Sequence, residues 1–257
     1  MTPEELYHYD VSGYLYLEDA IEPGYFARLN ERMDEWEEET RKQLEKREDR
    51  SNPNVMVEDI LNLDDAFLSL VANPKVLPYI DEMIERPRLK STWLDFKWQG
   101  GATGFHSNHT PTNVHNHYHV NNGRIYHNLF QVFYAMSDIG PGEGGLKLIP
   151  GSHKTDFPVP KGDISDLEVE ITMKAGSVLI FTHDARHGSL NTSKKVRRVV
   201  IFTYCPVEIS NSFVGDTLYN RLFERAPENS WLKYLLRRPH GFLETYPHPD
   251  GRPYEDG

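Results

Sequence analysis

Short apolar segments with the spacing of β-strands dominate this chain from Leu89 onwards. Before Leu89 the apolar residues recur at helical spacing, and after it they recur with the period of two that is typical of strands. Six segments fit strands: 89–98, 129–136, 145–149, 168–173, 177–182 and 199–204. Gly and Pro residues, not helices, fill the gaps between them. Strands joined by turns predict a mainly β fold, an antiparallel sandwich or barrel.

The first part of the chain predicts helices that decorate this barrel. An apolar alternation over 13–17 predicts one short strand. Apolar spacing and stop signals predict helices over 23–47, 64–71, 76–84, 218–223 and 231–236. We therefore expect one domain over 1–257, whose parts are a helical N-terminal part over 1–88, a barrel core over 89–206 and a C-terminal extension over 207–257.

Composition excludes several classes of protein. The chain carries 28 Lys and Arg against 39 Asp and Glu, and its net charge of −11 argues against a nucleic-acid partner. Its single cysteine, Cys205, excludes an intramolecular disulfide and a CxxC zinc site. No apolar run approaches the roughly 18 residues of a membrane span, so no membrane partner is expected. The polar, acidic start is unlike a signal peptide, which predicts a cytoplasmic location.

The histidine content points to a metal site. Six of the 12 histidines fall between His106 and His127. In extended segments, His106 and Asn108 share one side, and so do the histidines of 115–119. Imidazole is the commonest metal ligand among side chains, and a site usually needs two or three. A second segment, 175–189, is an apolar strand that leads to His183 and His187, so we predict a ligand from each segment.

A pair of arginines opens the last predicted strand. Arg197 and Arg198 precede an apolar run, and a buried arginine is costly unless it is paired. A fixed guanidinium beside a metal site suits a carboxylate ligand, whereas the alternative is a pair with an internal acid. The glycine- and proline-rich segment 144–154 predicts a tight turn in which His153 has a structural role. Nucleophile-elbow, HExxH, P-loop and dinucleotide-binding motifs are lacking in the sequence.

These segments together resemble the phytanoyl-CoA dioxygenase family of iron- and 2-oxoglutarate-dependent oxygenases. Segment 144–154 looks like the family signature G-G-L/F-x-x-x-P-G-S/T-H-K, and 175–189 resembles its distal-histidine segment. The eleven-residue step from His187 to Arg198 fits the family spacing. The resemblance implies a double-stranded β-helix, a jelly roll or cupin-like barrel, with Fe(II) and 2-oxoglutarate as cofactors and a small molecule as substrate.

The same resemblance assigns roles to five residues. His187 matches the distal iron ligand, and Arg198 matches the anchor for the far carboxylate of 2-oxoglutarate. Ser189 matches a hydroxyl beside that anchor. Lys97 and Phe133 stand where the family has a lysine and an aromatic residue near 2-oxoglutarate.

The proximal iron motif of the family, His-x-Asp, is not found between residues 89 and 144. The best match for the metal is His106, in a His-Ser-Asn sequence that resembles a His-Gly-Gly variant of the family, and segment 115–117 is its rival. Asn108 is then a weak third ligand, or the position is vacant and holds a halide, as in related halogenases. Alternatively His117 or His183 completes a three-histidine site. Loss of activity is a further alternative.

We therefore predict an oxygenase that hydroxylates a small molecule or oxidises its C–H bonds in a related way. One alternative is a cupin-like metalloenzyme that is independent of 2-oxoglutarate and binds metal through His115, His117 and His187. The other is a metal-free binding protein that retained the barrel. The substrate, the third ligand and the oligomeric state are left open by the sequence.

Overall fold

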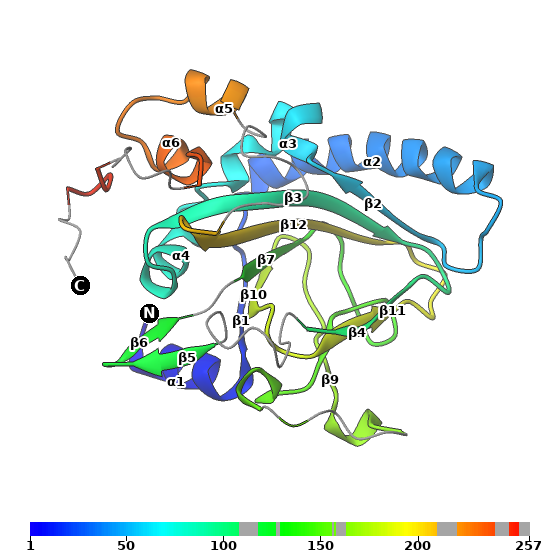
Figure 1. Ribbon diagram of the computed structural model, residues 1–257. Coiled ribbons are helices and arrows are strands. Elements are labelled where there is room, and N and C mark those ends of the chain that lie inside the picture. The colour runs from blue at the N-terminus through cyan, green and yellow to red at the C-terminus, as the bar shows by residue number, and fades with distance from the viewer. Residues whose placement is uncertain are drawn as a thin grey trace.

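Two antiparallel sheets and a covering of helices make up the part of the chain that the computed structural model describes (Figure 1). That part comprises residues 1–107, 118–126, 129–155, 157, 163–209, 220–239 and 247–251. The predicted class, mainly β with helices, is confirmed. Among the described residues no strand pairing joins the two sheets.

The larger sheet has six strands in the order β1-β10-β7-β12-β3-β2, and every neighbouring pair is antiparallel. Its strands are β1 (Tyr14–Leu17), β2 (Asn54–Glu58), β3 (Pro87–Lys97), β7 (Phe130–Ala135), β10 (Val178–Thr182) and β12 (Arg197–Pro206). Both edges, β1 and β2, therefore come from the N-terminal part that was expected to be helical apart from 13–17. Strand β2 could not be predicted from its sequence pattern, because only Val55 of its five residues is buried.

The smaller sheet has four strands in the order β4-β11-β8-β9. These are β4 (Ala102–His106), β8 (Lys147–Leu148), β9 (Val169–Glu170) and β11 (His187–Leu190), and a separate hairpin joins β5 (His119–Asn121) to β6 (Arg124–Tyr126). All six strands predicted after residue 88 are confirmed, as β3, β7, β8, β9, β10 and β12. Strands β4 and β11 lack an apolar run, and hairpin partners of three residues are too short to be read from a pattern.

The helices are α1 (Pro3–Ser12), α2 (Pro23–Lys46), α3 (Ile60–Leu63), α4 (Leu77–Met83), α5 (Asn220–Arg225) and α6 (Trp231–Leu236), with 3-10 turns η1 (Asp65–Leu70), η3 (Ser152–Lys154) and η4 (Ser165–Leu167). The five predicted helices correspond to α2, η1, α4, α5 and α6. Helix α1 is polar and was not predicted, but Thr2 and Glu5 form a capping box at its start. No helix of the described segments is long and apolar enough to span a membrane.

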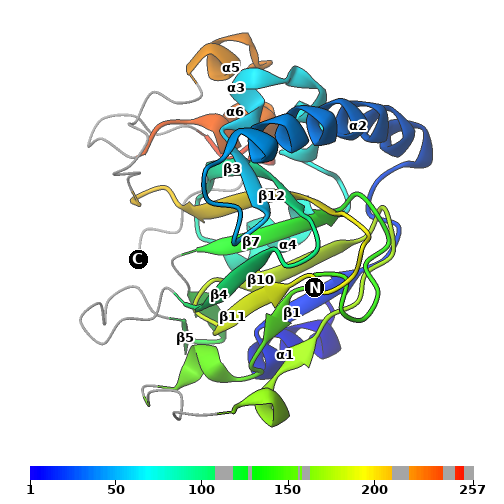
Figure 2. The same ribbon diagram turned by 90° about the vertical axis from the view of Figure 1, so that its right-hand side faces the viewer.

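The long helix α2 covers one face of the six-stranded sheet. Figures 1 and 2 both place α2 on the side of β3 that faces away from β4 and β11. Because side chains alternate along a strand, each central strand contributes to two cores. On β7, Val132 and Tyr134 join the core under the helices, whereas Phe133 and Ala135 join the core between the sheets. The face on which a polar residue lies therefore decides whether it meets the helices or the space between the sheets.

Candidate active site

A cavity of about 250 Å³ lies between the two sheets and is lined by residues of both. Its apolar lining is Met56, Trp93, Phe133, Leu146 and Ile201. Its polar lining is Asp95, Lys97, Thr103, His106, Gln131, His183, His187, Ser189 and Arg197. A concave, largely apolar site with a few convergent polar groups is typical of a binding site for a small molecule.

Three histidines from three strands meet in this cavity. His106 ends β4 and lies directly opposite His187, the first residue of β11. His183 follows the last residue of the apolar strand β10. The ring centroids are 4.3 Å apart for His106 and His187, 5.0 Å for His183 and His187, and 5.5 Å for His106 and His183. One nitrogen of each ring lies within 4.8 Å of the others, so the three imidazoles form a cluster that can hold a metal ion.

Backbone carbonyls orient two of these rings. The Nδ1 of His187 lies 2.7 Å from the carbonyl oxygen of Ala185, and the Nδ1 of His106 lies 2.8 Å from that of Gly104. An Nδ1–H group that donates to a carbonyl leaves Nε2 as the unprotonated nitrogen, and metal-binding histidines usually have this arrangement. The residues present therefore fit a metal ion.

Burial keeps two of the histidines neutral. Burial lowers the pKa of His187 to about 4, although the bond to Ala185 opposes this shift, and His106 and Arg186 make smaller contributions that lower it. Burial also lowers the pKa of His183 well below its usual range, with a contribution from His187 and His106. Neutral imidazole is the form that binds metal ions, so both rings are in the competent state at neutral pH.

A buried cation pair shares the cavity with the histidines. The Nζ of Lys97 lies 2.8 Å from Oδ2 of Asp95, and the guanidinium of Arg197 bonds to the same oxygen. Burial raises the pKa of Asp95, but Arg197 and Lys97 outweigh it and hold that pKa below its usual value. Burial and Arg197 lower the pKa of Lys97 to about 8. Two cations against one carboxylate leave a positive charge that suits an anionic ligand.

Arg198, the predicted carboxylate anchor, does not line the cavity. It lies opposite Phe96 on the helix-covered face, where its Nη1 lies 2.6 Å from Asp34 and its Nε 2.6 Å from Glu37 of α2. Arg197 lines the cavity instead, 3% exposed, and its Nε has no hydrogen-bond partner among the described residues. The family spacing of eleven residues from His187 therefore ends at the arginine on the helix-covered face, because a step of one residue along β12 changes the face.

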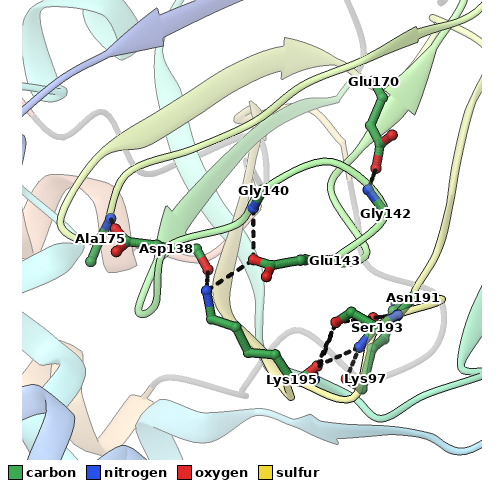
Figure 3. Close-up of polar contacts among 10 residues, drawn as sticks. All are labelled: Lys97, Asp138, Gly140, Gly142, Glu143, Glu170, Ala175, Asn191, Ser193 and Lys195. Carbon is green, nitrogen blue, oxygen red and sulfur yellow. Dashed lines mark hydrogen bonds and ion pairs between the residues drawn. The ribbon is translucent and has the colours of Figure 1, made fainter.

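Hydrogen bonds hold the turn between β11 and β12, which leads directly to Arg197 (Figure 3). The buried amide of Asn191 donates to the carbonyl oxygens of Lys97 at 2.8 Å and Lys195 at 2.7 Å. The backbone N–H of Ser193 donates to Oδ1 of Asn191 at 3.0 Å. The Nζ of Lys195 lies 2.9 Å from Glu143. These bonds attach the turn to the end of β3 and so hold Arg197 in register with Lys97.

The structure brings most of the predicted site residues together. His106, His183 and His187 form the cluster, while Lys97, Phe133 and Ser189 line the same cavity. Asn108 and His117, the other candidates for a third ligand, lie outside the described residues, as does His115.

His153 lies outside the cavity, as its predicted structural role requires. It is 1% exposed, and its Nε2 lies 3.0 Å from the carbonyl oxygen of Asp10 in α1. Sequence reasoning missed Asp95 and Arg197 as cavity residues, and the arginine that it chose, Arg198, lies on the other face of the sheet. The signal for Asp95 was its place two residues before Lys97 in the same strand, which puts both charged groups on one face.

The sequence matches the family described as phytanoyl-CoA dioxygenase (PhyH) over residues 9–199. The chain belongs to this family. Membership confirms the prediction of an oxygenase that depends on Fe(II) and 2-oxoglutarate. A search of curated proteins finds no match.

Three solved structures of other enzymes are similar in fold to this member of the phytanoyl-CoA dioxygenase family. HygX from Streptomyces hygroscopicus, with nickel and 2-oxoglutarate bound, is 17% identical with a TM-score of 0.66, over 80% of this chain and 87% of that one. SnoK, a non-heme α-ketoglutarate-dependent carbocyclase from nogalamycin biosynthesis, is 18% identical with a TM-score of 0.62, over 86% and 90%. SnoN, an epimerase from the same biosynthesis, is 16% identical with a TM-score of 0.57, over 80% and 83%.

Proposed function

We propose that this oxygenase oxidises a C–H bond of a small molecule in the cavity between its sheets, with iron held by His106 and His187 and 2-oxoglutarate anchored by Arg197. One observation carries the proposal: a histidine cluster and a buried cation pair line the same cavity. Two facing sheets with such a cavity support a double-stranded β-helix as the finer description of the fold, and we infer that the chain acts as one domain.

Arg197 and Lys97 are suited to hold the far carboxylate of 2-oxoglutarate. A guanidinium offers parallel N–H donors that match a carboxylate, and its Nε has no hydrogen-bond partner in the described part of the chain. Asp95 holds the two cations side by side without cancelling both charges. Ser189 contributes a buried hydroxyl and Phe133 an aromatic wall to the same cavity.

The apolar lining keeps water from the bound groups. Phe133, Leu146 and Ile201 are nearly fully buried, and a low-dielectric wall strengthens the pairing of the carboxylate with Arg197. When bound, iron would supply the oxidising chemistry, with dioxygen as the oxidant and 2-oxoglutarate as the co-substrate that becomes succinate and carbon dioxide. Met56, which is 44% exposed, lies where the lining meets solvent, and with Trp93 it offers an apolar surface to a substrate.

The neighbouring structures support a small-molecule substrate. HygX has been solved with hygromycin B bound and SnoN with nogalamycin RO. A cavity of about 250 Å³ that opens beside Met56 accommodates part of such a molecule, and we propose that the reacting carbon enters while the remainder stays outside. The outcome we favour is hydroxylation or a related C–H oxidation.

Anaerobic titration with Fe(II) and 2-oxoglutarate tests the proposal. Chelation of Fe(II) by the 2-oxo acid should give a weak metal-to-ligand charge-transfer band. Succinate is the matched control because it lacks the 2-oxo group, and it should give no band. Stoichiometric Fe(II) binding without a band would contradict the proposal and favour a metalloenzyme that is independent of 2-oxoglutarate. A protein that binds no metal under these conditions would favour the metal-free binding protein.

A further inference from the structure

We infer that His183 is the third protein ligand of the metal, so that three imidazoles and no carboxylate form the site. The inference rests on the proposed iron site at His106 and His187 and adds a residue to it. Its basis is the position of His183, whose ring completes a triangle with the other two at the wall of the cavity.

The spacing of the three rings fits one ion. A metal–nitrogen bond to imidazole is about 2.1 Å long, so two nitrogens on one ion lie at most about 4.2 Å apart. The nitrogens of the three histidines lie within 4.8 Å of one another in the absence of an ion. Small side-chain rotations close this difference. Each ring also comes from a different strand end, so the sheets fix the triangle independently of the metal.

The surroundings of His183 indicate a missing partner. Its Nδ1 is buried and has no hydrogen-bond partner among the described residues, whereas the Nδ1 atoms of His106 and His187 each face a carbonyl oxygen. A buried nitrogen without a partner is costly, and a bound ligand is one way to satisfy it. The half-buried ring therefore lies at the cavity beside two oriented imidazoles, and no hydrogen bond of its Nδ1 to a described residue explains its place.

The nearest acids are engaged elsewhere. Asp95 lines the cavity but bonds to both Lys97 and Arg197. Asp184, the neighbour of His183 in the chain, accepts the backbone N–H of Tyr118 at 3.0 Å. The cluster that can hold an ion therefore contains three histidines and no carboxylate within the described segments.

A neutral ligand set has a consequence for binding. Three imidazoles leave the full charge of a divalent ion, whereas a carboxylate ligand would cancel part of it. Together with the uncompensated cation beside Asp95, this makes the cavity strongly positive when the metal is bound. We therefore expect metal and dicarboxylate to strengthen each other's binding, and nitrogen-preferring ions such as Co(II) to bind far more tightly than Mg(II).

Proton NMR of the full chain loaded with Co(II) counts the imidazole ligands directly. Each coordinated imidazole contributes an exchangeable, paramagnetically shifted N–H signal. We expect three such signals in the wild type and two in His183→Ala, with the Co(II) dissociation constant raised at least about tenfold. His183→Asp should keep two signals and bind more tightly than His183→Ala because it returns an oxygen ligand. His8→Ala, on α1, is the matched control and should keep all three signals.

The outcomes separate this inference from the proposed function. Three signals and unchanged Co(II) affinity in a folded His183→Ala, together with losses in His106→Ala and His187→Ala, would overturn the role of His183 alone. A wild type that binds no Co(II) would overturn the proposed iron site as well. Melting of the metal-free variants, followed by circular dichroism, shows whether each is folded, and His183→Asp provides the second test where His183→Ala is not.

Discussion

Arg197 and Arg198 are consecutive in the chain, yet they lie on opposite faces of the six-stranded sheet. Arg197 bonds to Asp95 inside the cavity, whereas Arg198 bonds to Asp34 and Glu37 on helix α2. The first contact prepares a site for an anion, and the second attaches a helix to the outer face of the sheet. The alternation of side chains along one strand thus separates a binding role from a structural role.

Replacement of Asp95 by Asn should destabilise the protein. It should also increase the stabilisation that a bound dicarboxylate gives. The change leaves Arg197 and Lys97 buried without their shared carboxylate, and loss of one partner of a buried pair costs about 3–5 kcal/mol of unfolding free energy. Urea unfolding measures this loss. A dicarboxylate that binds the two cations should then raise the melting temperature of Asp95→Asn more than that of the wild type.

The exposed Asp34 provides the control for this prediction. Asp34→Asn removes a surface contact of Arg198 and should change the unfolding free energy by less than about 1 kcal/mol. Succinate serves as the dicarboxylate. If it raises the melting temperature of Asp95→Asn and of the wild type equally, Arg197 and Lys97 do not bind a dicarboxylate in competition with Asp95.

Replacement of Asn191 by Ala should weaken dicarboxylate binding without touching the cavity lining. The change removes the bonds that join the turn before β12 to the carbonyl oxygens of Lys97 and Lys195. We expect a loss of about 2–4 kcal/mol in unfolding free energy, because buried acceptors lose their donors, and a several-fold weaker dicarboxylate affinity as Arg197 loses its fixed place. Ser193→Ala is the control, because it keeps both hydrogen bonds that the Asn191 amide donates. It should change the unfolding free energy and the dicarboxylate affinity less than Asn191→Ala does. Unchanged affinity in Asn191→Ala would exclude the turn as the element that positions Arg197.

Replacement of Gly188 by Ala should separate the two strands that carry His106 and His187. A Cβ at residue 188 would lie 2.8 Å from the carbonyl oxygen of Thr103 on β4, which is closer than real contacts allow. We expect the free energy of unfolding to fall by about 1–3 kcal/mol and Co(II) affinity to fall with it. Gly104→Ala, also on β4, is the matched control because its Cβ meets no atom within 4 Å. Equal Co(II) affinities in the two variants would contradict the prediction.

Acid should destabilise the fold partly through His153. Burial lowers the pKa of His153 to about 4, below the usual value of 6.5, although the carbonyl of Asp10 opposes this shift. The unfolded chain therefore binds the proton more tightly than the folded chain, and this contribution to stability is lost as pH falls from about 6.5 towards 4. Between pH 7 and pH 5 it amounts to about 2 kcal/mol. Urea unfolding of His153→Gln at both values should show a pH dependence smaller by this amount, and an identical pH dependence would contradict it.

Much of the fold could be predicted because its signals are local. The period-two runs located six strands, and helical spacing located α2 and α4. Strands β4 and β11 could not be located from their residues, since they are polar and glycine-containing and become strands only by pairing with their neighbours in the sheet. Their pairing places His106 opposite His187.

The candidate site was predicted in its residue types more completely than in its geometry. Lys97, Phe133, His187 and Ser189 line the cavity as the family resemblance implied. The choice between two adjacent arginines depends on where β12 begins, and long-range bonds from Asn191 set that point. A spacing rule drawn from a family selects a position in the chain, and it does not show on which face of the strand that side chain lies.

We propose above all that Arg197, and not Arg198, anchors 2-oxoglutarate. The most direct test compares the affinity for 2-oxoglutarate of two matched variants, Arg197→Ala and Arg198→Ala. Isothermal titration calorimetry of the Fe(II)-loaded protein without oxygen measures it. We predict that Arg197→Ala weakens binding by at least about tenfold, because a charge-assisted bond is lost, whereas Arg198→Ala stays within about twofold of the wild type. A loss confined to Arg198→Ala, with Arg197→Ala unchanged, would contradict it.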